Sequence, residues 1–128
     1  MKTNRHSRIV IALLAVVILI ACNGKTLQLK PEEEPNRAYY EHLLMHSQAV
    51  QKFAEAAMKY NLHFDAADPA TQDVLVKEVD PLWLKASDAL DAWEVAIKAG
   101  KTGESEIEAY KRIKTQILLA VPDLLWGE

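Results

Sequence analysis

The stretch that decides the fold is Asp80-Pro-Leu-Trp-Leu-Lys-Ala-Ser-Asp-Ala-Leu-Asp-Ala-Trp-Glu-Val-Ala-Ile-Lys-Ala-Gly100. Its apolar residues recur at steps of three and four, which places them on one face of a helix. The members of this face are Leu82, Ala86, Ala89, Leu90, Trp93 and Ile97. Asp80 followed by Pro81 predicts an N-cap and a first turn, and Gly100 predicts the residue that ends the helix.

A second Asp-Pro pair, Asp68-Pro69, predicts by the same argument a short helix from Pro69 to about Val79. Pro81 then either opens a new helix or kinks the existing one, because proline lacks the N–H that a helix interior needs. We therefore expect one long helix broken at Pro81, with residues 61–67 as the connector that precedes it.

Two further long helices are expected on either side of this one. The first runs from about Asn36 to Asn61, and its apolar face comprises Leu43, Ser47, Val50, Ala54 and Ala57, flanked by Tyr40, Leu44, Phe53 and Met58. The last follows a tight link at residues 101–103, with either Thr102 or a capping box at Ser105–Glu108 at its start. Its face comprises Ile107, Tyr110, Ile113, Ile117, Ala120 and Val121. No strand pattern occurs, so residues 36–128 are predicted to form an all-α, small antiparallel helical bundle of three long helices.

The C-terminal tail follows Pro122, which interrupts the last helix. The spacing of the last apolar face would next fall on Leu124. The tail therefore either docks on the bundle or leaves it and presents Leu124, Leu125 and Trp126 as a partner contact. We expect docking, because monomers rarely leave such an apolar cluster in water.

The N-terminus has a basic segment, Met1–Arg8, and then an apolar run, Ile9–Ala21, that stops at the single cysteine, Cys22. A membrane-spanning helix needs about 20 apolar residues, so the run is too short to span and fits a secretory signal peptide. Leu19-Ile20-Ala21-Cys22 resembles a bacterial lipobox. The resemblance implies that a lipoprotein signal peptidase removes residues 1–21, cutting between Ala21 and Cys22, and that Cys22 is lipidated. The alternative is an uncleaved N-terminal anchor.

The same resemblance bears on location. Asn23, where an Asp commonly retains such lipoproteins in the inner membrane, implies an outer-membrane lipoprotein facing the periplasm. Residues 22–35 are expected to form an extended tether, since Pro31 and Pro35 flank the acidic run Glu32–Glu34.

The net charge of the chain bears on which classes of partner it can bind. The whole chain has 15 basic and 18 acidic residues, and residues 1–21 hold Lys2, Arg5 and Arg8 and no acidic residue. The mature chain therefore keeps 12 basic residues against 18 acidic ones, a net charge of −6. An acidic domain argues against nucleic-acid binding, for which basic patches are typical.

Chemistry-bearing residues are sparse. His42 and His46 stand one helical turn apart and are weak candidates for a metal site, but no third ligand is evident, so we expect His46 to edge the core. No nucleophile–base pair or phosphate loop occurs, and Cys22 is assigned to lipid. The sequence thus predicts a non-catalytic protein-interaction module in the cell envelope, without a cofactor beyond the covalent lipid. The alternative is a periplasmic carrier that binds a metal or a small apolar ligand between helices.

Overall fold

The structure is a computed structural model that describes residues 28–126. Its elements are η1 (Pro31–Asn36), α2 (Arg37–Ala66), α3 (Pro69–Val74), η2 (Leu75–Val79), α4 (Asp80–Lys98), α5 (Glu104–Ala120) and η3 (Pro122–Leu124). The described residues are helical without strands, which confirms the all-α prediction. The predicted signal peptide, its cleavage site and Cys22 lie outside the described residues.

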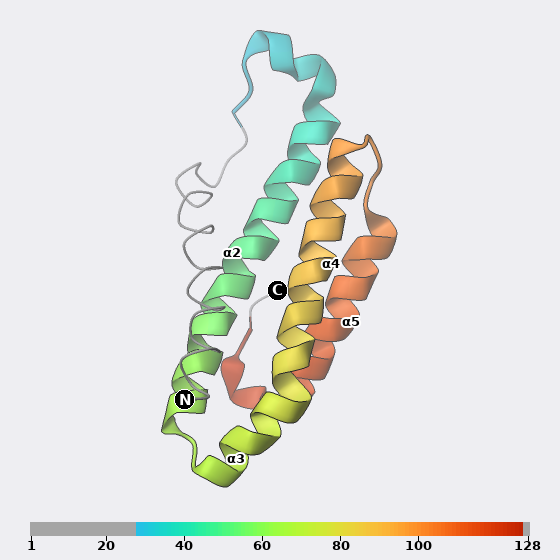
Figure 1. Cartoon of the computed structure of the whole chain (residues 1–128). Coiled ribbons are helices and arrows are strands. Elements are labelled where there is room, and N and C mark those ends of the chain that lie inside the picture. Colours follow the sequence, from blue (N-terminus) through green and yellow to red (C-terminus); the bar gives the residue numbers. More distant parts are fainter. Residues whose placement is uncertain (1–27, 127–128) are drawn as a thin grey trace.

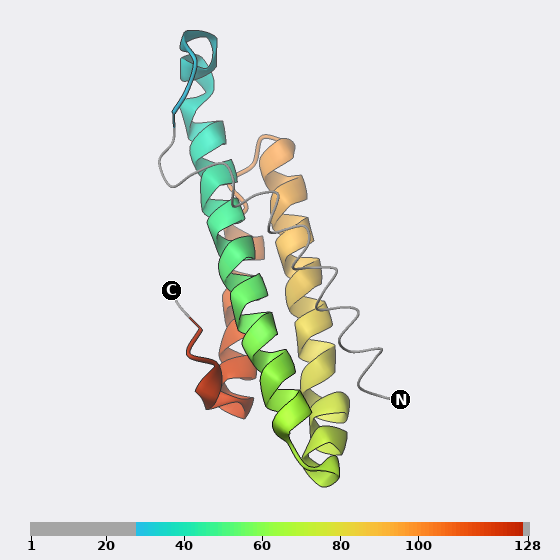
Figure 2. The same cartoon turned by 90° about the vertical axis from the view of Figure 1, so that its left-hand side faces the viewer.

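Three long rods form the body of the molecule. Figure 1 shows the chain running down α2, turning through α3, climbing along α4 and descending along α5. α4 packs against both α2 and α5, whereas the backbones of α2 and α5 approach each other much less closely. Figure 2, a quarter turn away, shows η3 beside α2, so the chain's last described segment returns to the first long helix.

The first long helix is longer than the sequence predicted. α2 continues to Ala66, so the connector expected at residues 61–67 is wrong in all but its last residue. Residues 61–66 contain neither glycine nor proline, and Phe64 falls one turn after Tyr60 on the same buried face. The amide of Gln72 donates a 2.8 Å hydrogen bond to the carbonyl of Phe64 near the helix end. Burial of Phe64 therefore extends the helix beyond the residue at which the pattern had seemed to stop.

The extended backbone expected at Glu32–Glu34 is also wrong, because η1 is a 3₁₀ helix. Pro31 occupies its first turn, where the missing N–H costs nothing. The backbone N–H of Lys30 donates to the Glu33 carboxylate at 2.9 Å, and Arg37 donates to both carboxylate oxygens of Glu34. The acidic run is therefore part of a 3₁₀ helix, and this part of the predicted tether is not extended.

Pro81 does not interrupt the second rod. The helix passes through it as α3, η2 and α4 in direct succession, and η2 is a π-helical turn. The N–H of Asp80 bonds to the carbonyl of Leu75, five residues back. A widened turn relieves the clash that Pro81 would make with the carbonyl four residues before it. Of the two outcomes that the sequence left open, the structure shows a local distortion within one rod.

The helix caps divide into confirmed and wrong predictions. Asp68 caps α3, since its carboxylate accepts the N–H of Thr71 at 2.7 Å. Asp80 is not a cap: it lies inside the helix and accepts a 2.6 Å hydrogen bond from the Tyr60 hydroxyl. Gly100 ends α4 as predicted, with φ of 82°, and bonds to the carbonyl of Ile97 at 2.9 Å. This positive φ is the left-handed conformation that a helix-terminating glycine adopts.

The start of α5 contradicts both predicted caps. Gly103, with φ of 77°, occupies the N-cap position, and neither Thr102 nor Ser105 serves there. Gly103 is buried, and a Cβ placed on it would lie 2.8 Å from Cδ1 of Trp93. The link between α4 and α5 therefore depends on the absence of a side chain at this residue.

We expect Gly103→Ala to destabilise the fold by about 2–4 kcal/mol, from the left-handed conformation and from overpacking against Trp93. Gly100→Ala is the matched control, because Gly100 has the same sign of φ but nothing within 4 Å of an added Cβ. It should cost only about 1–2 kcal/mol, the conformational part alone. Urea unfolding of both variants measures the difference, and equal losses would contradict the close contact.

The core is a run of aromatic rings along the axis of the bundle. Trp83 and Trp126 stack with their ring centroids 5.2 Å apart and their planes only 6° apart. Phe53 and Tyr60 of α2 lie against Trp83 at 5.3 and 5.2 Å. The sequence assigned Met58 and Ala120 to apolar faces, but both are exposed, so these faces are rotated slightly from the predicted ones.

Candidate functional site

The tail after Pro122 fills part of the space between α2 and α5. Leu124 is 1% exposed and Trp126 8% exposed, so the docked tail that the sequence favoured is the one observed. The Trp126 ring contacts Phe53 of α2 at 5.9 Å and Tyr110 of α5 at 6.2 Å. Of the three tail residues considered as a partner contact, only Leu125 presents its side chain to solvent. The tail therefore packs between α2 and α5, whose backbones approach each other little.

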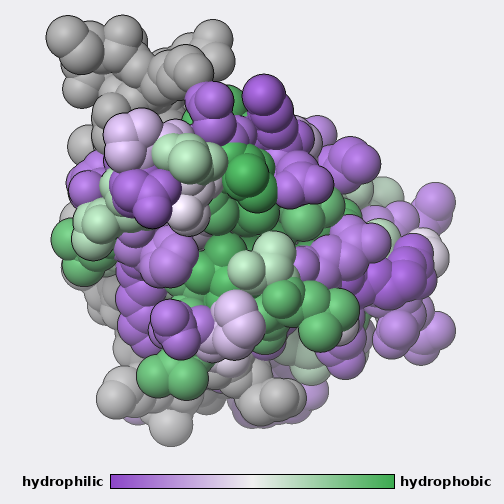
Figure 3. All heavy atoms as spheres, turned by 90° about the horizontal axis from the view of Figure 1, so that it is seen from below, coloured by the Kyte–Doolittle hydropathy of each residue, from purple (hydrophilic) through white to green (hydrophobic). Residues whose placement is uncertain are grey.

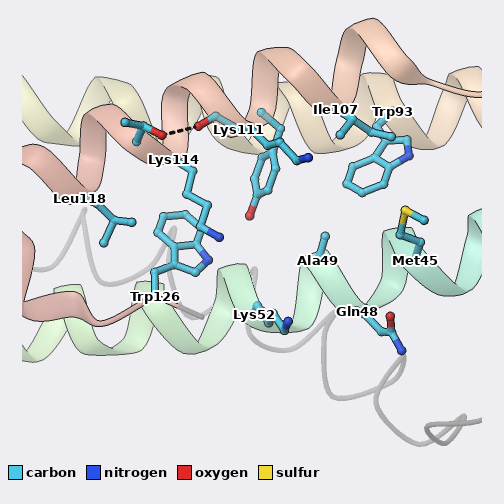
Figure 4. Close-up of a pocket in the computed structure, with 12 residues that line it drawn as sticks. Met45, Gln48, Ala49, Lys52, Trp93, Ile107, Lys111, Lys114, Leu118 and Trp126 are labelled. Atoms are coloured by element: carbon cyan, nitrogen blue, oxygen red, sulfur yellow. Dashed lines mark hydrogen bonds between the residues drawn. The ribbon is translucent and has the colours of Figure 1, made fainter. Parts of the chain in front are cut away.

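A groove of about 480 Å³ lies beside Trp126, the last described residue of the docked tail. One side is a stripe of α2, formed by Met45, Gln48, Ala49 and Lys52. The opposite side is a stripe of α5, formed by Ile107, Tyr110, Lys111, Lys114, Thr115 and Leu118. Trp93 of α4 and Trp126 of the tail complete the lining. Figure 4 shows the two stripes facing each other across the groove, with the indoles of Trp93 and Trp126 toward its two ends.

The charge of the groove opposes that of the chain. Lys52 projects from α2, and Lys111 and Lys114 project from α5, while no acidic side chain is among the described residues that line the groove. The Nζ of Lys114 also lies 5.5 Å from the centroid of the Trp126 ring, within the range of a cation–π contact. An apolar floor with a cationic edge is therefore set into an otherwise acidic protein.

The aromatic floor holds unsatisfied polar groups. The Nε1 atoms of Trp83, Trp93 and Trp126 are buried without a hydrogen-bond partner among the described residues. Leaving such a donor unpaired costs about 1–3 kcal/mol. Figure 4 shows the nitrogen-bearing edge of Trp126 on the side of the ring that faces the groove, between Lys114 and Lys52. The Nε1 of Trp93 instead lies beside Gly103, since a Cβ placed on Gly103 would be 3.3 Å from it.

Tyr110 lies between these two indoles on the floor of the groove. Its ring centroid is 6.3 Å from that of Trp93 and 6.2 Å from that of Trp126. Burial raises the pKa of its hydroxyl well above the usual range, so the group stays neutral at physiological pH. A neutral hydroxyl can donate or accept a hydrogen bond.

The two histidines considered as a metal site lie in different surroundings. His46 is buried, its Nε2 lies 2.8 Å from the carbonyl oxygen of Leu90, and its ring meets Trp93 edge-on at 5.1 Å. His42 is only half-buried, one turn away. Among the described residues, no three side chains of the metal-ligating types lie together. His46 thus joins α2 to α4 across the core, as the sequence expected of a histidine at the core edge.

Sequence reasoning missed the groove and all three of its lysines. Each lysine lies beside an apolar face and has the pattern of an ordinary solvated residue. Their convergence depends on which stripes of α2 and α5 face each other and on where the tail stops. No local signal in the sequence carries that information.

Comparison of the chain with protein-family models, curated proteins and solved structures found no match. Within residues 28–126, no helix combines the length and apolar character that are needed to cross a bilayer.

Proposed function

We propose that this protein is a bacterial lipoprotein whose antiparallel helical domain, held at the membrane through lipid on Cys22, acts by binding a ligand in the groove between α2 and α5. The observation that carries this proposal is the groove itself, which is open, largely apolar and of defined shape. Its volume of about 480 Å³ lies within the range of about 300–1,000 Å³ typical of small-molecule pockets. The anchor is supported by the lipobox-like residues Leu19–Cys22.

We place ligand binding, the alternative expected from the sequence, ahead of the protein-interaction module. Two turns of a docked helix, with a diameter of about 10–12 Å, would occupy roughly twice the volume of the groove. About half of a docked helix would therefore lie outside the groove, whereas a small molecule could lie within it. A ligand carrier consequently fits this site better than a protein-interaction module does.

A protein partner remains the second candidate, on a different observation. Leu62, Leu119 and Leu125 are all largely exposed, between 68% and 78%. Figure 3, seen from below, shows apolar residues gathered over that end of the bundle. Exposed apolar patches mark contact surfaces when they are contiguous. This end, rather than the groove, is where a protein partner would dock.

The proposal predicts that an apolar molecule enters the groove and reaches its indoles. Neutral 12-bromododecanol should quench the fluorescence of the full chain saturably, since bromine quenches tryptophan on contact and Trp93 and Trp126 line the groove. Ala49→Phe, which fills the groove from α2, should weaken this quenching by about tenfold or more, a loss of roughly 1.4 kcal/mol of binding.

The matched control is Ala92→Phe on the exposed face of α4, away from the lining. It should leave the quenching curve unchanged, and circular dichroism should show both variants equally helical. Identical quenching of the two variants would show that the probe binds elsewhere and would remove the groove as the site.

A further inference from the structure

We propose that the ligand of this groove is an anionic amphiphile with one unbranched chain, such as a fatty acid or a lysophospholipid with an anionic headgroup. This inference rests on the proposed function and adds to it the charge and shape of the ligand. It follows from three features of the described residues: the cationic edge, the aromatic floor and the length of the groove.

The lysines at the edge of the groove favour a ligand with an anionic headgroup. Lys52 on α2 and Lys111 on α5 belong to opposite sides of the groove, so both of its sides carry a positive charge. With no acidic side chain in the described lining, nothing there repels a carboxylate or phosphate. A cationic or zwitterionic headgroup would bring a positive charge against these lysines, which is unfavourable.

The floor selects an apolar body. Ile107 and Leu118 of α5 lie in the lining together with the faces of the aromatic residues, and Met45 adds a flexible side chain that adapts to the shape of its contact. Burying apolar surface yields about 25 cal/mol per Å². The hydrocarbon part of an amphiphile thus supplies affinity, and the lysines supply orientation.

The shape of the groove selects an unbranched chain. Its lining runs from Ile107 to Leu118 along α5, which corresponds to about 16 Å at 1.5 Å per residue. The opposite stripe, from Met45 to Lys52, covers about 10 Å of α2 by the same measure. A long, narrow space between two helix stripes accommodates an extended chain better than a compact ring system.

Trp126 supplies one further polar contact. Its buried Nε1–H has no partner among the described residues and belongs to the edge of the ring that faces the groove. A headgroup oxygen that reached this donor after a small shift of the ring would satisfy it. The geometry thus offers a neutral donor beside the lysines, as anion sites in proteins commonly do.

The test compares probes that carry the same bromine-terminated hydrocarbon chain and headgroups of opposite charge. The full chain, reconstituted into phosphatidylcholine vesicles, is titrated with 12-bromododecanoate and with (12-bromododecyl)trimethylammonium while tryptophan fluorescence is recorded. We expect the carboxylate to quench saturably and to bind about tenfold more tightly than the ammonium probe, or more. The variant Ala49→Phe gives the background from probe in the lipid phase.

The lysines are tested by the double variant Lys52→Gln/Lys111→Gln, which should weaken carboxylate binding about tenfold, since it removes two positive charges from the edge of the groove. The control Lys85→Gln/Lys101→Gln removes the same charge from exposed positions outside the lining and should leave binding unchanged.

Equal binding of the two charged probes, or equal weakening by both double variants, would overturn the anionic assignment. Neutral 12-bromododecanol would still report whether the groove binds at all. Loss of the charge preference alone therefore refutes this inference and leaves the proposed function standing, whereas absence of quenching by every probe refutes both.

Discussion

Removal of residues 122–128 should abolish the cooperative fold or lower its melting temperature by tens of degrees. The deletion removes Leu124 and Trp126, both buried, from the space between α2 and α5. Losing a buried leucine costs about 2–5 kcal/mol and losing a buried tryptophan about 3–5 kcal/mol. Their sum is comparable with the entire stability of about 5–15 kcal/mol that a native protein possesses.

The geometry explains why a short tail has so large an effect. Trp126 stacks on Trp83 of α4 and also contacts α2 and α5, so it is the residue at which all three rods meet. The backbones of α2 and α5 approach each other little, and without the tail Phe53 would lose its contact with the Trp126 ring. Circular dichroism melts of the truncated and full chains measure the effect.

Leu125→Ala is the matched control for this deletion. Leu125 is 78% exposed and should contribute within about 0.5 kcal/mol, as other exposed positions do. A truncated chain that melted within a few degrees of the full one would show that the tail is an accessory segment rather than part of the core. The deletion itself also removes Trp126 from the lining of the groove.

Cys22→Ser should reduce incorporation of a labelled fatty acid to background and cause the unprocessed precursor to accumulate. In the proposed modification the lipid is attached through the sulfur atom of Cys22, and serine offers no thiol for that bond. Two or more acyl chains hold a protein at a membrane far more firmly than the reversible attachment that one chain provides. The mutant should therefore also lose its lipid-mediated attachment to the membrane. In the labelling assay the change should be complete, from normal incorporation to background.

Thr26→Ala, four residues beyond the predicted modification site, serves as the control and should label normally. Normal labelling of the Cys22→Ser protein would contradict the lipobox interpretation. The uncleaved anchor would then be the better account of the N-terminus. The groove and its ligand would not be affected by that outcome.

Local signals in the sequence predicted much of the fold. The apolar face of α4 places Ala86, Leu90, Trp93 and Ile97 in the core, where the structure shows them. Asp68 and Gly100 occupy the caps that their side-chain chemistry favours. These features depend on residues within one or two turns of each other, so the sequence pattern contains them.

The wrong predictions concern features that depend on contacts beyond one or two helical turns. α2 runs past Asn61, where Phe64 joins the buried core, and Gly103 occupies the N-cap of α5, where an added Cβ would lie 2.8 Å from Trp93. Asp80 gave a plausible cap signal, but the Tyr60 hydroxyl across the bundle binds its carboxylate. In each case a contact between separate helices outweighed the local preference. The groove belongs to the same class, because its lysines meet only after the helices have packed.

A native mass spectrum of the protein released from its own membranes tests the central claim most directly. We predict a polypeptide beginning at Cys22 with covalent diacylglyceryl and acyl groups, together with a non-covalently bound anionic amphiphile. The Ala49→Phe variant should keep the covalent mass and lose the bound molecule. An unlipidated chain beginning at Met1, or a wild-type protein that carries nothing which Ala49→Phe removes, would contradict the account.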